Sequence, residues 1–110
     1  MTFLSENTSG KYAVIFTARL TKQLGGYEDA VSMLRARLKE HEGFLGLESV
    51  SDEQGEEITI SYWDNERSIR QWRDDPEHQE IRNKYRTKWY AHFKVRVVRI
   101  EREYEMSSNG

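Results

Sequence analysis

The sequence contains no cysteine, which excludes disulfides, thiolate metal sites and cysteine nucleophiles. It also has no apolar run near the roughly 20 residues that a helix needs to span a bilayer. Residues 1–10 are polar and lack the basic and apolar regions of a signal peptide. We therefore expect a cytoplasmic protein that does not enter a membrane.

Apolar residues are scarce as well, at 36% of the chain against 33% charged residues. The length of 110 residues fits one domain, which we place at residues 11–104. The ends, 1–10 and 105–110, are rich in Ser, Asn and Gly and are predicted to be flexible tails. Because the core is lean for this length, part of the apolar burial is expected to come from a second subunit.

Hydrophobic periodicity predicts the secondary structure. Alternation of apolar and polar residues indicates strands at 12–20, 44–50, 56–63 and 92–101. Helical spacing indicates a helix over 27–39, a short helix over 65–73 capped by Asp64, and a third helix that begins at Asp75-Pro76. Proline suits the first helical position and Asp75 suits the N-cap.

The predicted order is β-α-β-β-α-β with the second helical segment divided in two. It is typical of an α+β, ferredoxin-like fold, an antiparallel four-stranded sheet with helices on one face. The other face also carries apolar side chains, so we expect a homodimer in which two sheets pack together.

This order is shared by RNA-binding RRM domains, and residues 82–102 carry eight basic side chains against the single Glu101. RRM domains place stacking aromatic residues on the third strand. Here residues 56–61 are acidic and aliphatic instead. We therefore expect no nucleic-acid partner, and we interpret the basic segment mainly as a solvated surface.

Five residues are candidates for a site. His78 can act in acid–base catalysis because imidazole titrates near neutrality, although a histidine there can also hold the loop by a hydrogen bond. Trp72 can stack on a flat substrate or pack in the core. Trp63 is expected in a pocket wall or an interface, while Arg82 and Tyr85 share a helix face with His78 and can bind a phenolate or carboxylate. His41 and His92 have no second ligand at metal spacing, so no metal site is expected.

The residues Tyr62-Trp63-Asp64, Ile69, Trp72, Pro76-Glu77-His78 and Trp89-Tyr90, with the closing segment 95–104, resemble the antibiotic biosynthesis monooxygenase (ABM) family. The likeness is to its small, stand-alone Bacillus-type members and spans about residues 12–104. It implies a homodimeric α/β barrel with a pocket between sheet and helices in each subunit. It also implies a cofactor-independent monooxygenase acting on a small aromatic or polyketide-like substrate, with His78 and Trp72 as catalytic residues.

Two alternatives remain open within this resemblance. The superfamily includes haem degraders that use an Asn on the first strand, a Trp on the short helix and a His on the next helix. Trp72 matches that Trp, but Ala18 and Arg82 occupy the other two positions. A haem or planar-ligand binding protein, with His78 as a substitute ligand, is therefore the second hypothesis, and a non-catalytic dimeric member is the third.

Overall fold

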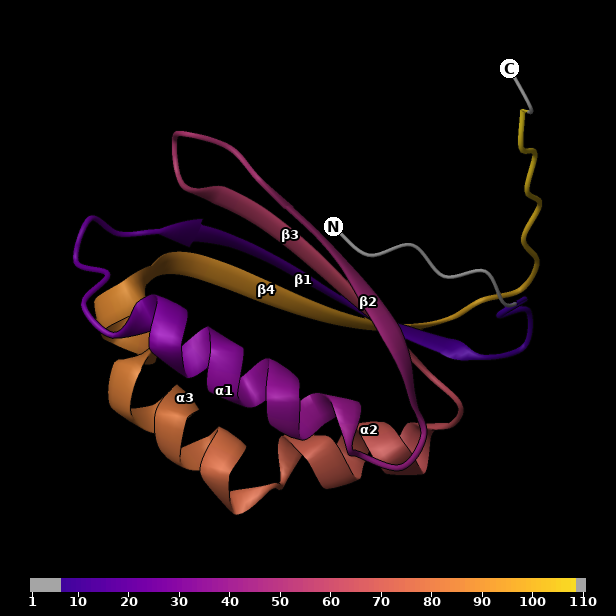
Figure 1. Ribbon diagram of the computed structural model, residues 1–110, viewed down its shortest axis with the longest axis horizontal. Coiled ribbons are helices and arrows are strands. Elements are labelled where there is room, and N and C mark those ends of the chain that lie inside the picture. Colours follow the sequence, from indigo (N-terminus) through magenta and orange to yellow (C-terminus); the bar gives the residue numbers. More distant parts are fainter. Residues whose placement is uncertain (1–6, 109–110) are drawn as a thin grey trace.

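A computed structural model describes residues 7–108, and its elements follow the predicted order. The strands are β1 (Tyr12–Leu20), β2 (Phe44–Ser51), β3 (Glu56–Trp63) and β4 (Tyr90–Arg99), and the helices are α1 (Tyr27–Lys39), α2 (Glu66–Arg73) and α3 (Pro76–Trp89). Figure 1 shows all three helices on one side of the sheet. The α+β, ferredoxin-like fold is thus confirmed.

The sheet has the strand order β2-β3-β1-β4, and every neighbouring pair is antiparallel. β1 lies in the middle and pairs with β3 through Phe16↔Thr59 and with β4 through Phe16↔Val95. Because side chains alternate across a strand, these paired residues point to the same face, toward the helices. β4 begins at Tyr90, two residues before the predicted start, because Tyr90 already pairs with Leu20.

The N-termini of α2 and α3 are fixed by side-chain caps. Asp75 caps α3 as predicted, accepting hydrogen bonds from the backbone N–H groups of Glu77 (3.0 Å) and His78 (3.1 Å). The predicted cap of α2 is wrong by one residue: Asn65 accepts the bond from the N–H of Ser68 at 2.8 Å. Asp64 instead forms an ion pair with Lys11, which draws its carboxylate away from the helix.

Gly43 joins α1 to β2 and approaches α2 closely. Its backbone has a φ of +87°, in the left-handed region that favours glycine. A Cβ built at this position would lie 2.0 Å from the Oγ of Ser68 and 2.6 Å from its Cβ. The carbonyl of Gly43 also accepts a hydrogen bond from the N–H of Asp64 at 2.8 Å. Glycine is therefore required where this turn meets the start of α2.

The predicted tails fall partly outside the described residues, which leave out 1–6 and 109–110. Thr8 is buried, with 3% of its surface exposed, and its hydroxyl donates to the Glu103 carboxylate at 2.7 Å. Its backbone N–H donates to the same carboxylate, and the N–H of Gly10 donates to the carbonyl of Ile100 at 2.8 Å. The segment that precedes β1 is thus held against the segment that follows β4.

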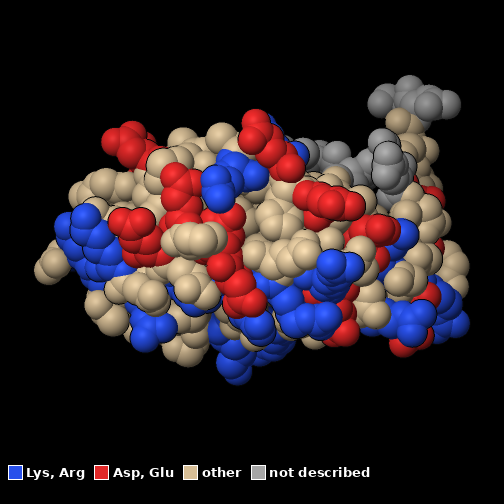
Figure 2. Space-filling model, turned by 90° about the horizontal axis from the view of Figure 1, so that it is seen from below, with Lys and Arg blue, Asp and Glu red and all other residues tan. Residues whose placement is uncertain are grey.

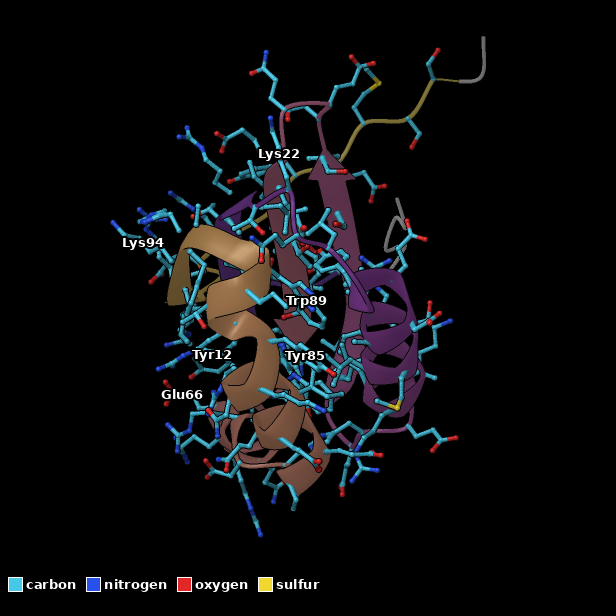
Figure 3. The ribbon with its side chains drawn as sticks, turned by 90° about the vertical axis from the view of Figure 1, so that its left-hand side faces the viewer. Tyr12, Lys22, Glu66, Tyr85, Trp89 and Lys94 are labelled. Atoms are coloured by element: carbon cyan, nitrogen blue, oxygen red, sulfur yellow. The ribbon has the colours of Figure 1, made fainter. Side chains whose placement is uncertain are left out.

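The two faces of the sheet are covered unequally. On the helix side, Trp89 and Ile81 of α3 are buried with Ala30 of α1, and Tyr85 and Tyr27 pack around them. Figure 3 shows Tyr85 and Trp89 one above the other on the side of α3 that faces α1. On the opposite face, Val50 and Ile58 leave 52% and 44% of their surfaces exposed. Within the described part of the chain, no helix is long and apolar enough to cross a membrane.

Candidate functional site

A cavity of about 600 Å³ lies between the helix-facing side of the sheet and the three helices. Its walls are mainly apolar: Val14, Phe16, Leu47, Phe93, Val95 and Val97 come from the strands, and Leu34, Leu38, Ile69 and Ile81 come from the helices. Four of the five candidate residues, Trp63, Trp72, His78 and Arg82, also line it. This volume is in the range of sites that bind small molecules.

His78 and Trp72 form a stacked pair across the turn between α2 and α3. Their ring centroids are 4.5 Å apart and their planes differ by 14°. The Nδ1 of His78 lies 3.0 Å from the carbonyl oxygen of Trp72. Because a carbonyl can only accept a hydrogen bond, we assign the proton to Nδ1. The other ring nitrogen, Nε2, then carries a lone pair and can accept a proton.

The environment keeps the His78 ring neutral. Burial lowers the pKa of His78 below its usual value of 6.5, and the positive charge of Arg82 lowers it further. The Trp72 carbonyl and the Asp75 carboxylate act in the opposite direction, but burial dominates. At neutral pH the ring is therefore a proton acceptor. The predicted loop-holding hydrogen bond is also present, and it orients the ring through Nδ1, while Nε2 has no hydrogen-bond partner among residues 7–108.

Trp63 closes the cavity at the end of β3. Only 1% of its surface is exposed, and its indole N–H donates to the hydroxyl of Ser61 at 2.9 Å. Phe44 and His41 contact its ring edge-to-face at centroid distances of 5.5 and 5.8 Å, and His41 also contacts Trp72. Trp63 is thus a rigid wall of the cavity.

Arg82 and Tyr85 lie on the same helix but in different surroundings. Arg82 lines the cavity, and its buried Nε has no hydrogen-bond partner in the described residues. Tyr85 is absent from the lining and stacks on Trp89, with centroids 4.4 Å apart and planes that differ by 10°. The structure therefore brings together the other four candidates and places Tyr85 against the core.

Sequence reasoning missed a polar pair that also lines the cavity. The hydroxyl of Tyr27 donates to the Glu57 carboxylate at 2.6 Å, and Thr59 donates to the same carboxylate at 3.3 Å. Burial, and then the Glu57 bond, raise the pKa of Tyr27 far above its usual value, so the phenol stays neutral. The alternation that places Thr59 and Trp63 on one face of β3 also places Glu57 there and could have identified it.

Two further predictions from the sequence concern Ala18 and metal binding. Ala18 is buried in the sheet and does not line the cavity. Within residues 7–108, no three His, Cys, Asp or Glu side chains lie close enough to hold a metal ion together.

Comparison with known proteins finds a matching family and a related bacterial protein. The family model described as antibiotic biosynthesis monooxygenase matches residues 18–84. An uncharacterised protein of Bacillus subtilis (strain 168), YqjZ, is 38% identical over 104 residues, which cover 94% of this chain and 91% of that protein.

Two solved structures show the same fold at low sequence identity. SnoaB, a cofactor-independent oxygenase from Streptomyces nogalater, superposes with a TM-score of 0.70 at 9% identity, over 93% of this chain and 100% of that one. A conserved protein from Methanosarcina mazei Go1 gives a TM-score of 0.74 at 12% identity, over 84% and 94% of the two chains.

Proposed function

The chain belongs to the antibiotic biosynthesis monooxygenase family, and on that premise we propose that it is a cofactor-independent monooxygenase for a small aromatic or polyketide-like substrate. One observation carries the proposal. A neutral imidazole, that of His78, is held against Trp72 in an apolar cavity, with Nε2 available as a base. The cofactor-independent oxygenase of Streptomyces nogalater supports this assignment through its common fold.

The cavity suits a flat, apolar substrate. Trp72 and Trp63 provide aromatic walls, and aromatic rings prefer stacked or edge-to-face contacts with one another. His78 and Trp72 act as catalytic residues in this proposal, while Trp63 and Arg82 hold the substrate. Tyr85 contributes by stacking on Trp89, which supports the helix that carries His78 and Arg82.

The reaction needs no external reductant when the substrate is an anthrone-type compound, with a methylene between aromatic rings. The Nε2 of His78 removes one methylene proton, and the resulting carbanion is delocalised over the rings. The carbanion passes one electron to O₂, and the radical pair combines to a peroxide that takes the proton back. Loss of the second C–H proton then breaks the O–O bond. The carbon is oxidised by four electrons to a carbonyl, and the other oxygen leaves as water.

Oxygen uptake tests this function. With a hydroxylated anthrone, the protein is expected to consume one O₂ per substrate and to form the quinone without added nicotinamide, flavin or metal. The control is the same assay with heat-denatured protein, since anthrones also oxidise slowly in solution. Absence of protein-dependent uptake across a panel of such substrates would contradict the proposal. A Soret band on haem addition that requires His78 would instead assign the cavity to haem.

We also propose that two copies pair through the uncovered sheet face. Val50, Ile58 and Val98 on this face expose 52%, 44% and 36% of their surfaces, and burial of such apolar area stabilises association. A lean core makes this additional burial important for a chain of this length. Sedimentation equilibrium at micromolar concentration is expected to give twice the 13.1 kDa chain mass. A monomer mass under these conditions would refute the pairing.

A further inference from the structure

The cavity carries an excess of positive charge. Five arginines line it, namely Arg35, Arg70, Arg73, Arg82 and Arg86, against the two carboxylates of Glu57 and Glu66. Figure 2 shows the molecule from the helix side, with Lys and Arg gathered along the lower edge and Asp and Glu concentrated above them. The mainly apolar cavity is thus lined in part by positively charged side chains.

Much of the acidic charge near the cavity is already engaged. Glu66 lies 4.0 Å from Arg70, and Asp74 is held by Arg73 at 3.0 Å. The Glu57 carboxylate accepts hydrogen bonds from Tyr27 and Thr59. The hydrogen bond from Arg73 is the main cause that lowers the pKa of Asp74, and the positive charge of Arg82 lowers it further.

Arg82 carries a buried donor that has no acceptor among the described residues. In the part of the chain that the structure describes, neither Arg82 nor Arg86 has a carboxylate within ion-pair distance, and the buried Nε of Arg82 has no acceptor. A guanidinium does not lose its charge by deprotonation in proteins. Leaving the buried Nε–H donor of a charged guanidinium without an acceptor is unfavourable. An anion that entered the cavity would relieve this cost.

We propose that the substrate of this cavity is a planar aromatic carboxylate, with its carboxylate on Arg82 and its rings toward Trp72. The inference rests on the proposed oxygenase function and adds the charge of the substrate. Arginine presents a planar fork of donors that matches a carboxylate in two parallel hydrogen bonds. Arg86 follows Arg82 by one helical turn and adds positive charge at the exposed edge of the cavity. The imidazole of His78 lines the same cavity and stacks on Trp72, beside the place proposed for the rings.

A matched pair of ligands tests the charge preference without turnover. Anthraquinone-2-carboxylate and its neutral carboxamide have nearly the same shape, and tryptophan fluorescence quenching reports their binding. The wild-type protein is expected to bind the carboxylate at least about tenfold more tightly, which equals about 1.4 kcal/mol. Arg82→Gln is expected to remove most of this preference while it leaves carboxamide affinity within about twofold. Equal wild-type affinities, or an unchanged preference in Arg82→Gln, would overturn the inference.

Two further variants make the result specific. Arg67→Gln alters an exposed arginine of α2 that does not line the cavity, and it is expected to keep the full preference. Arg86→Gln is expected to reduce the preference by a smaller factor and tests the proposal even if Arg82→Gln does not fold. Because binding is measured without oxygen consumption, the charge inference and the oxygenase proposal can fail separately. If a neutral anthrone were oxidised but the carboxylate ligand were not preferred, only the charge inference would be refuted.

Discussion

Replacement of His78 by glutamine is expected to lower kcat for anthrone oxidation by about 10²–10⁴-fold, the usual contribution of a positioned general base. Glutamine keeps a polar side chain of similar length but cannot accept a proton at neutral pH. KM is expected to change little, because Trp72, Trp63 and Arg82 still line the cavity. Steady-state oxygen uptake with the variant measures both constants.

The pH dependence separates a catalytic base from a residue that only holds the loop. The pKa of His78 is lowered below 6.5 by burial, so the active neutral form predominates above that depressed pKa. Activity of the wild-type protein should therefore rise with pH through a pKa below 6.5 and then level off. His78→Gln should lose this acidic limb together with its activity. His92→Gln, at an exposed histidine outside the cavity, should retain both. A fully active His78→Gln protein would place the base elsewhere.

Replacement of Gly43 by alanine is expected to lower the free energy of unfolding by about 2–5 kcal/mol. A left-handed φ of +87° costs a residue with a Cβ about 1–2 kcal/mol. The new methyl group would also meet the Oγ of Ser68 at 2.0 Å, and such overpacking costs about 1–3 kcal/mol more. Since a domain of this kind is stable by only about 5–15 kcal/mol, thermal or urea denaturation will detect the change easily.

Gly10 provides the matched control for this substitution. Its φ is +79°, but a Cβ there would meet nothing within 4 Å. Gly10→Ala should therefore show the conformational cost alone, about 1–2 kcal/mol. If Gly43→Ala were no more destabilising than Gly10→Ala, the close packing of the α1–β2 turn against α2 would be refuted.

Most of the fold was predictable because its signals are local. Alternation along 12–20 and 56–63 fixes which side chains face the helices, and Asp75-Pro76 marks the start of α3 through capping and a fixed φ. The α2 cap was misplaced because Asp64 and Asn65 are both good caps by type. The choice between them depends on Lys11, which is far away in sequence and attracts Asp64.

The candidate site was predictable only in part. His78 and Trp72 could be named from residue type and helix face, but their stacking depends on the turn between two helices. Tyr85 was assigned to the same helix face as Arg82, yet its ring stacks on Trp89 and packs against the core. The Tyr27–Glu57 bond joins distant segments, and the burial of the Arg82 Nε without an acceptor in the described residues depends on the folded structure as a whole. Periodicity assigns a face to such residues, but it does not determine their partners.

Oxidation under ¹⁸O₂ tests the central claim most directly. Chelator-treated protein is incubated with a hydroxylated anthrone in unlabelled water, and the product is analysed by mass spectrometry after a short reaction. The proposed reaction predicts one ¹⁸O atom in each quinone formed by the protein, and the second labelled atom in water. Incorporation of oxygen from solvent into the product, or no excess of labelled quinone over the protein-free reaction, would contradict it.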